Sequence, residues 1–248
     1  MANGEEADGK FAEMHEARRA RAQRLGGTYV GDWVLGANDG VITTFAVVAG
    51  ARGGALGLVA VLILGFANLL ADGFSMGASN YLSRRSLRAY MQSEEEALRW
   101  EIEHEPEEKK IELEQRISRM GVPGRYQECM IGGFTSGVRP WLRALMAFGF
   151  GLGDREGKHW KHGLLTLIAF IIAGAFPLLP YLIIPGEHAF TASAAAAAIT
   201  LFTAGALRTL ITGINWLRSG LEMLAVGSLA AAVAYGAGHY ASILVGQG

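Results

Sequence analysis

Five apolar segments dominate the pattern of hydrophobic and polar positions along the chain. They cover residues 29–51, 56–82, 163–184, 189–207 and 223–246. A helix needs about 20 predominantly apolar residues to cross a bilayer, and these segments are close to that length. In the third segment, Pro177 and Pro180 predict a kink or a broken last turn, which neighbouring helices make tolerable in a membrane. The pattern predicts an all-α membrane protein with five transmembrane helices.

A polar insert, residues 84–162, separates the second and third apolar segments. Pro106 is expected to separate two helices, because the residue before a proline avoids the α region, and Gly121 followed by Pro123 ends the second. A third helix is expected at about residues 140–149, where apolar side chains recur at helical spacing. No break follows the second apolar segment, so its helix is expected to continue into water. The predicted parts are a tail at 1–28, spans at 29–83, the insert at 84–162 and spans at 163–248.

The charges of the chain are strongly segregated. Hydrophobic residues make up 51% of the chain and charged residues 18%, with a net charge of −1. Of the 22 Lys and Arg, all except Arg52 fall in residues 1–28, 84–162 and 208–218. By the positive-inside rule these segments are cytoplasmic, which predicts the N-terminus inside and the C-terminus outside. The arginines before the first span are interpreted as a topology anchor, and no nucleic-acid partner is expected.

Polar side chains within the first two apolar segments are the main candidate functional residues. Asn68, Asp72 and Met76 lie four residues apart, so they line one face of a helix. Asp39, flanked by two glycines on the first span, is expected to face this stripe. Oxygen ligands combined with a thioether suit a late first-row divalent ion such as Fe²⁺ better than Mg²⁺ or Ca²⁺. Because ionisable groups are costly in a membrane span, we interpret these four residues as metal ligands on a transport path.

Two plainer interpretations of these side chains stay open from the sequence. The two aspartates would then cap backbone groups or pair with arginines near the bilayer edge. The methionine would be a packing residue, as most membrane methionines are.

Glutamates in the insert form a second candidate site. They recur at three-, four- and seven-residue steps as Glu94, Glu101, Glu105, Glu108 and Glu112. This spacing gathers carboxylates on one stripe, where like charges four residues apart repel by a few tenths of a kcal/mol. A metal ion, a partner or the neighbouring Lys and Arg would offset the repulsion, and a solvated charged face is the alternative.

Three stretches of the chain resemble the vacuolar iron transporter family. They are GANDGVITTFAVVAG, SMGASNYLSRRS and GAFPLLPYLI, and LRSGLEMLAVGSLAAAVAYG near the C-terminus is similar to bacterial members. The resemblance runs from residue 29 to the C-terminus. It implies a non-enzymatic homodimer of five-span protomers in a bacterial inner membrane, without a permanently bound cofactor. It further implies export of Fe²⁺, and often Mn²⁺, in exchange for protons, through a pore between spans one and two of each protomer.

The resemblance also assigns membrane residues. The family's membrane aspartate falls on Asp39 and its methionine on Met76. Its intramembrane glutamate falls on Asn68, a departure for which Asp72, one turn along the helix, is expected to compensate.

In the insert the resemblance is only partly retained. Glu101 and Glu112 keep the family's carboxylates, whereas two other glutamate positions fall on Leu98 and Lys109. The Met-Met and Glu of the third helix correspond to Leu145, Met146 and Gly149. This implies a weakened or rearranged collection site that uses Met146 and draws on Glu105, Glu108 or His104.

Two alternatives belong to other functional classes. One is a non-transporting membrane protein that binds or senses metal through a degenerate cytoplasmic site. The other is an intramembrane hydrolase with Asp39 and Asp72 as an acid/base dyad, for which the sequence contains neither a protease motif nor a Ser/His arrangement.

Overall fold

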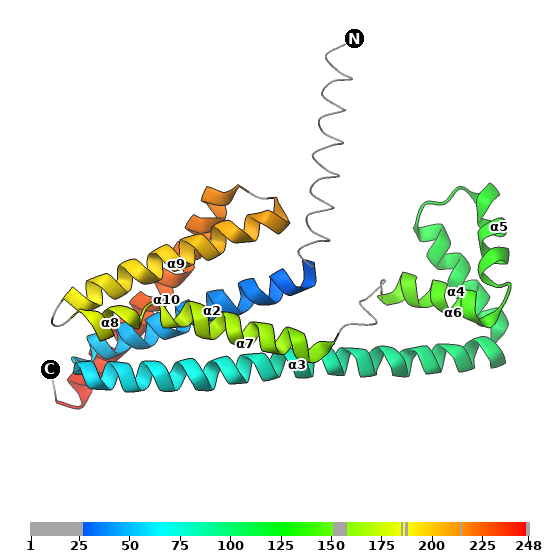
Figure 1. Ribbon diagram of the computed structural model, residues 1–248. Coiled ribbons are helices and arrows are strands. Elements are labelled where there is room, and N and C mark those ends of the chain that lie inside the picture. The colour runs from blue at the N-terminus through cyan, green and yellow to red at the C-terminus, as the bar shows by residue number, and fades with distance from the viewer. Residues whose placement is uncertain (1–26, 151–157, 185, 187, 214, 247–248) are drawn as a thin grey trace, which may run out of the picture. The chain divides into compact units, whose positions relative to one another are not determined.

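The computed structural model describes residues 27–150, 158–184, 186, 188–213 and 215–246 (Figure 1). Every regular element in these residues is an α-helix. The helices are α2 (Gly27–Gly53), α3 (Leu58–His104), α4 (Pro106–Arg119), α5 (Gly124–Phe134), α6 (Val138–Phe150), α7 (His159–Ala175), α8 (Leu179–Ile183), α9 (His188–Thr212) and α10 (Trp216–Leu244). They form two compact units, which we call the apolar unit (Met1–Tyr81 with Trp160–Gly248) and the charged unit (Leu82–His159).

Membrane-length helices make up most of the apolar unit. Among the described residues, four stretches are long and apolar enough to cross a membrane, namely Tyr29–Gly53, Leu58–His104, His188–Thr209 and Trp216–Leu244. Large apolar side chains on these helices are exposed, for example Phe74 at 69% and Leu229 at 68%. Such extensive apolar surface is unfavourable in water and normal in lipid, so this is a membrane protein.

The third predicted span consists of two helices. Helix α7 has 17 residues and ends at Ala175, and the short α8 begins at Leu179. Pro177 lies in the break, and Pro180 lies in the first turn of α8, where a missing N–H leaves no hydrogen bond unmade. The expected broken last turn is therefore confirmed.

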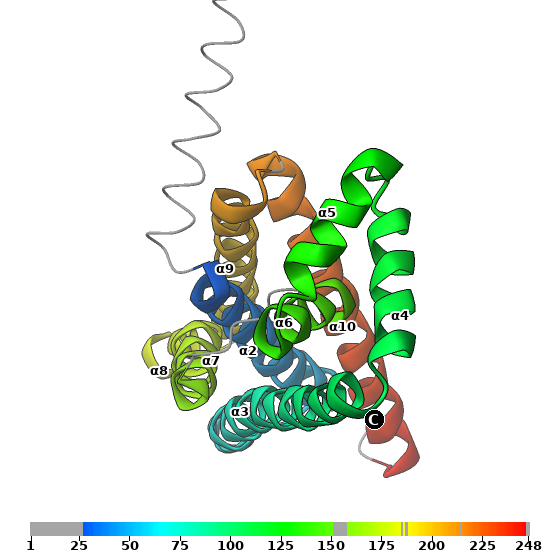
Figure 2. The ribbon, with the colours of Figure 1, turned by 90° about the vertical axis from the view of Figure 1, so that its right-hand side faces the viewer.

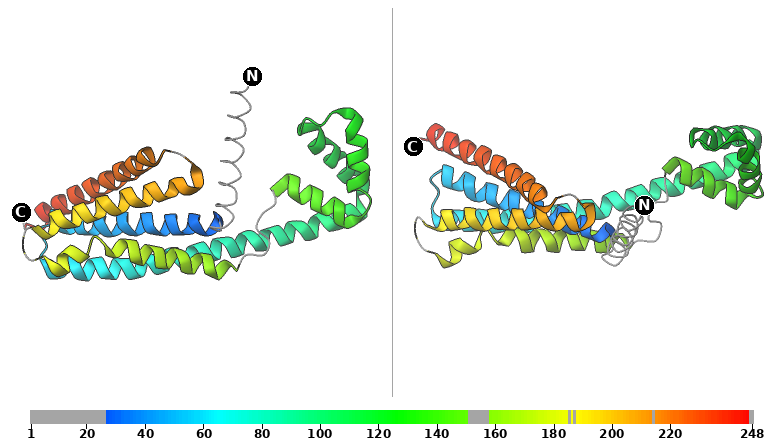
Figure 3. Two further views of the ribbon diagram at one scale, coloured as in Figure 1. Left: turned by 45° about the horizontal axis from the view of Figure 1, so that its top comes forward. Right: turned by 90° about the horizontal axis from the view of Figure 1, so that it is seen from above.

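Helix α2 lies in the middle of the apolar unit. It packs against α9 and α10, and α9 also packs against α10 (Figures 2 and 3). Helix α10 begins at Trp216, before the predicted start of its span at residue 223. Asn215 explains the earlier start, because its side chain caps the helix by accepting a hydrogen bond from the Leu217 N–H at 2.9 Å.

The charged unit has its own apolar core. Buried side chains come from the end of α3 and from α4, α5 and α6, and they include Leu98, Leu113, Ile131, Trp141 and Leu145. The α3–α4 break before Pro106 and the end of α4 are as predicted, and α6 covers the predicted third helix. Helix α5 was not predicted. The continuation of the second apolar segment into a polar helix is confirmed by the unbroken α3.

Candidate functional site

A lane of polar side chains runs between α2 and α3 in the apolar unit. Asn68, Asp72 and Met76 lie on one stripe of α3, all half-buried, and Asn80 extends the stripe by one further turn. The Asn80 amide donates a hydrogen bond to Asp32 Oδ1 on α2 at 2.8 Å, so the two helices meet here. We call the residues Asp32, Asp39, Asn68, Asp72, Met76 and Asn80 the polar lane.

The register of α2 and α3 brings the two predicted aspartates together. Asp39 lies seven residues after Asp32 on α2, and Asp72 lies eight residues before Asn80 on α3. Starting from the bonded pair Asp32 and Asn80, these are nearly equal steps along the two helices. The carboxylates of Asp39 and Asp72 are close enough to repel each other. Within the described residues neither one forms an ion pair, so the interpretation that arginines neutralise them is not supported. Two mutually repelling carboxylates form a natural site for a cation or for protons.

The glycines on either side of Asp39 allow another helix to approach. A Cβ on Gly36 would collide with the carbonyl oxygen of Thr166 on α7, and one on Gly40 with that of Phe170. The small size of these residues therefore lets α7 approach α2 closely. Since the backbone of α7 holds this turn of α2 in place, the position of Asp39 is fixed by helix packing.

Unpaired polar atoms lie further along α2 and α3. Asn68 Nδ2, Asn38 Oδ1 and Thr44 Oγ1 are buried and have no hydrogen-bond partner. A buried polar group without a partner costs about 1–3 kcal/mol, and such atoms call for a functional explanation. Thr44 Oγ1 lies on the side of α2 that faces α7, where a Cβ on Gly174 would be 2.9 Å from it.

The Met76 side chain packs against the apolar cluster that contains Leu69 and Phe170. It therefore has a packing role as well as a position on the polar stripe. Its thioether lies one turn from Asp72, so both interpretations of this methionine stay compatible with its placement.

A buried network at one end of the lane was not predicted from the sequence. His162 Nδ1 on α7 hydrogen-bonds Asp32 Oδ2, and the Asn80 amide also donates to Thr166 Oγ1 at 2.7 Å. Asp32, His162 and Thr166 are all buried, and Tyr29 stacks on the His162 ring with centroids 4.5 Å apart. Two sequence signals were available: Asp32 lies seven residues before Asp39, and Asn80 lies four residues after Met76.

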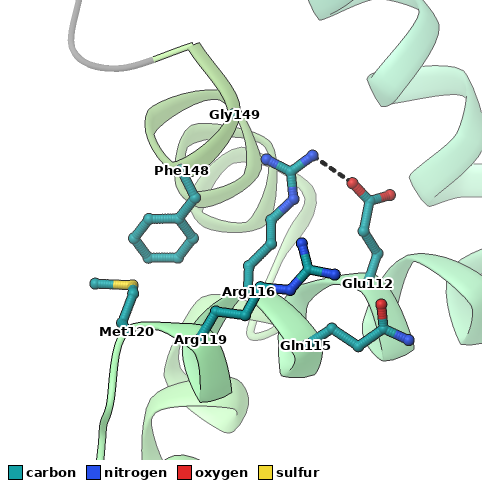
Figure 4. Close-up of a pocket in the computed structure, with 7 residues that line it drawn as sticks. All are labelled: Glu112, Gln115, Arg116, Arg119, Met120, Phe148 and Gly149. Carbon is teal, nitrogen blue, oxygen red and sulfur yellow. Dashed lines mark hydrogen bonds and ion pairs between the residues drawn. The ribbon is translucent and has the colours of Figure 1, made fainter.

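In the charged unit, two of the predicted carboxylates meet around a lysine. Lys109 Nζ lies 2.7 Å from Glu101 Oε2 and 2.9 Å from Glu112 Oε2. Arg116 Nη2 lies 2.5 Å from the other Glu112 oxygen (Figure 4). Burial alone would lower the pKa of Lys109, but hydrogen bonds to Glu101 and Glu112 raise it above its ordinary value. Burial alone would raise the pKa of Glu112, but hydrogen bonds from Lys109 and Arg116 lower it.

The remaining candidates of the charged unit lie apart from this cluster. Glu105 and Glu108 are exposed, and Met146 is buried in the apolar core with 2% of its surface exposed. His104 stacks on Trp100, with ring centroids 4.5 Å apart. Nowhere in the described chain do three or more His, Cys, Asp or Glu side chains gather in a way that would hold a metal ion.

Arg116 occupies the space next to Gly149. A Cβ on Gly149 would lie 2.6 Å from Arg116 Nη1, and the guanidinium lines a cavity of about 580 Å³. Figure 4 shows this cavity with the side chains of Gln115, Arg119 and Phe148 around it. A cation of the protein thus lies where the resemblance implies a metal-binding glutamate.

Comparison with known proteins agrees with the resemblance. The model of the VIT family matches residues 30–239. Vacuolar iron transporter 1 of Arabidopsis thaliana is 31% identical over 213 residues, which is 84% of this chain and 84% of that protein. The vacuolar iron transporter of Toxoplasma gondii (strain ATCC 50861 / VEG) is 31% identical over 229 residues, 88% of this chain and 76% of that protein. Vacuolar iron transporter 1 of Oryza sativa subsp. japonica is 29% identical over 212 residues, covering 85% and 84%. The chain therefore belongs to the VIT family, a family of transporters and not of enzymes.

Proposed function

We propose that this protein exports Fe²⁺, and also Mn²⁺, from the cytoplasm across a bacterial inner membrane in exchange for protons. The observation that carries the proposal is the pair Asp39 and Asp72, two half-buried carboxylates that repel each other between membrane-length helices. Support also comes from the relatives, which are named as vacuolar iron transporters.

Charge balance explains why such a pair suits exchange. Two carboxylates neutralise one divalent cation, and two protons neutralise the same two carboxylates after the cation has left. A membrane interior penalises every state with uncompensated charge, so cation and protons compete for the pair. Asn68 and Met76, on the same stripe, offer an amide oxygen and a thioether as further ligands, a mixed set that suits Fe²⁺.

The proposed topology has five spans, with α7 and α8 together forming the third. The N-terminus and the charged unit lie in the cytoplasm and the C-terminus lies outside, as the distribution of Lys and Arg predicts. Two protomers form a homodimer, and α2 and α3 of each line the pore. The Gly contacts around Asp39 leave that side of α2 to α7, so the polar lane reaches the pore along α3.

Transport in liposomes tests the proposal. We expect a flux of Fe²⁺ or Mn²⁺ that increases when a proton gradient drives protons in the direction opposite to the metal ion. In Asp39→Asn we expect this flux to fall by about tenfold or more. Glu222→Gln is the matched control, because Glu222 is an exposed carboxylate on α10 that pairs with Arg218 on the surface. Equal flux through the wild type and Asp39→Asn would reject the role of the aspartate.

The second candidate is a membrane protein that binds metal without transporting it. It predicts metal binding to the charged unit and no flux. The ion pairs of Glu101 and Glu112 with Lys109 argue against this candidate, because both carboxylates already have a cation.

A further inference from the structure

The cavity beside Gly149 in the charged unit has a positively charged lining that the proposed exchange does not use. Its volume of about 580 Å³ is within the range of about 300–1,000 Å³ that is usual for small-molecule sites. The ionisable side chains that line it are Glu112, Arg116 and Arg119. They follow one another on α4 at steps of four and three residues, so they share one face of that helix. Two guanidinium groups and one carboxylate give this lining an excess of one positive charge.

The carboxylate of the lining is already bound to cations of the protein. One Glu112 oxygen lies 2.5 Å from Arg116 Nη2 and the other lies 2.9 Å from Lys109 Nζ. Lys109 also pairs with Glu101 at 2.7 Å, so counting these two neighbours leaves the positive excess unchanged. Glu112 therefore does not cancel the charge of both arginines.

Arg119 has no partner in the described part of the chain. An arginine in the last turn of a helix often hydrogen-bonds the final carbonyl oxygens. In α4 these oxygens are bound by backbone groups instead. The Ile117 oxygen accepts from the Met120 N–H at 3.1 Å, and the next oxygen, of Ser118, accepts from the Gly121 N–H at 3.0 Å. The guanidinium of Arg119 is thus free to donate to a ligand.

Arg116 has one nitrogen that Glu112 does not use. Its Nη1 makes a contact of 3.4 Å with the Leu145 carbonyl oxygen, which is long for a hydrogen bond. The same nitrogen lies beside Gly149, where a Cβ would be 2.6 Å away. The missing side chain at Gly149 therefore makes room for this edge of the guanidinium at the cavity.

Apolar side chains complete the lining. Met120 and Phe148 lie around the cavity together with the two arginines and the Gln115 amide (Figure 4). A guanidinium matches the oxygens of a phosphate or a carboxylate with paired hydrogen bonds. A phosphate monoester suits two guanidinium groups better than a carboxylate does, because it carries more negative charge and three acceptor oxygens. An inorganic phosphate would leave the apolar part of the lining unused.

We propose that this cavity binds a water-soluble small molecule in which a phosphate monoester is attached to an apolar group. Arg119 and Nη1 of Arg116 bind the phosphate oxygens, and Phe148 and Met120 contact the apolar group. The inference goes beyond the proposed metal export and does not depend on it.

Phenyl phosphate is the probe that tests this site, because it combines the two features in one small molecule. Its binding to the purified full-length protein is measured by phosphorus NMR line broadening in a phosphorus-free detergent. We expect Arg119→Gln to weaken this binding by about tenfold, the usual effect of losing hydrogen bonds to a charged group. Arg99→Gln is the matched control, since Arg99 is an exposed arginine of the charged unit that does not line the cavity.

A second variant tests the site without changing its charge. In Gly149→Ala the added methyl group displaces the Arg116 guanidinium, so we expect weaker binding of phenyl phosphate than in the wild type. Equal binding by the wild type, Arg119→Gln and Gly149→Ala would overturn the proposal.

Competing ligands test the class of molecule. We expect inorganic phosphate and benzoate to displace phenyl phosphate only at higher concentrations than unlabelled phenyl phosphate would require. Inorganic phosphate that binds as tightly as phenyl phosphate would show that the apolar group is not recognised. Tighter binding of benzoate would assign the cavity to carboxylates, and tighter binding of a short-chain phosphatidylglycerol would assign it to a lipid headgroup. Each of these three results would overturn the proposed ligand.

Discussion

At the scale of single residues, Lys109 determines what Glu101 and Glu112 can bind. Its ammonium lies within 3 Å of both Glu101 and Glu112, and only 17% of its side chain is exposed. Arg116 supplies a second positive charge to Glu112. A divalent ion would have to displace the ammonium to use these carboxylates.

Removing this lysine should therefore create metal affinity. We expect Lys109→Ala to bind Mn²⁺ about tenfold or more tightly than the wild type at the charged unit, because Glu101 loses its cation and Glu112 keeps only Arg116. Binding is measured by calorimetry in an Asp39→Asn background, which removes the proposed membrane site. Lys110→Ala is the control, since Lys110 is an exposed neighbour without an ion pair in the described structure. Unchanged binding in Lys109→Ala would mean that the glutamates are not a metal site even when free.

The same cluster makes the stability of the charged unit depend on pH, with a loss of stability at acidic pH and another at alkaline pH. The pKa of Glu112 is lowered, so its contribution to stability is present above its ordinary value of 4.5 and is lost as pH falls through the lower folded value. The pKa of Lys109 is raised, so its contribution is present below 10.5 and is lost as pH rises through the higher folded value.

Hydrogen exchange of residues 101–119, corrected for the intrinsic rates, measures this effect. We expect protection to decrease at both limits by about 1 kcal/mol, the scale of a partly exposed ion pair. In the variant Glu112→Gln, we expect the loss of protection at acidic pH to disappear and the loss at alkaline pH to become smaller. A flat profile below pH 4.5 in the wild type would contradict the lowered pKa.

At the scale of elements, glycines decide how closely α7 approaches α2 and α3. A Cβ on Gly163 of α7 would lie 2.5 Å from the Gly77 carbonyl oxygen on α3, and one on Gly77 would lie 2.8 Å from the Gly163 oxygen. Backbone therefore packs directly on backbone, next to the Asp32 network. A small shift of α7 would also displace α2 and α3, because contacts between backbones cannot deform without separating the helices.

Gly163→Ala tests this packing. The added methyl should separate α7 from α3 and lower the free energy of unfolding by about 1–3 kcal/mol, as overpacking usually does. The midpoint of thermal unfolding in detergent reports the loss. Gly236→Ala on α10 is the control, because a Cβ there meets nothing within 4 Å and alanine is the better helix former. Equal midpoints for the two variants would show that the close contact is not required.

Contacts within one helix, and the approach of Asp39 to Asp72 on the next apolar segment, could be predicted from the sequence, whereas contacts between more distant segments could not. The stripe of Asn68, Asp72 and Met76 follows from helical spacing alone, and so does the break at Pro106. His162 and Asp32 are 130 residues apart, so no local pattern connects them. Helix α5 was missed because its eleven residues contain three glycines and bury only Ile131.

The charged unit illustrates a second limit of sequence reasoning. The spacing of Glu101 and Glu112 correctly suggested a shared cation. Only the structure identifies the nearest cation as Lys109, because its side chain reaches across from α4 to the end of α3.

At the scale of the whole molecule, the proposed orientation rests on where the charged unit lies. The chain has 1 cysteine, Cys129, and it is exposed on this unit. One native thiol therefore reports the side of the membrane on which the unit is found.

A membrane-impermeant maleimide should label Cys129 in inside-out vesicles and leave it unlabelled in right-side-out vesicles. The expectation follows from the proposed topology, in which the basic residues of the charged unit place it in the cytoplasm. The variant Cys129→Ser with Val245→Cys, at the end of α10, should show the opposite pattern. Labelling of Cys129 from outside would reverse the proposed topology.

The cation that Glu101 and Glu112 share is the Lys109 ammonium, which is covalently part of the chain. A counter-ion that is part of the polypeptide cannot diffuse away or be removed by a chelator, so this helical unit keeps its shape in a cell starved of iron. Its architecture would be indifferent to metal supply, so a response to the abundance of the ion would arise at the proposed membrane site of Asp39 and Asp72.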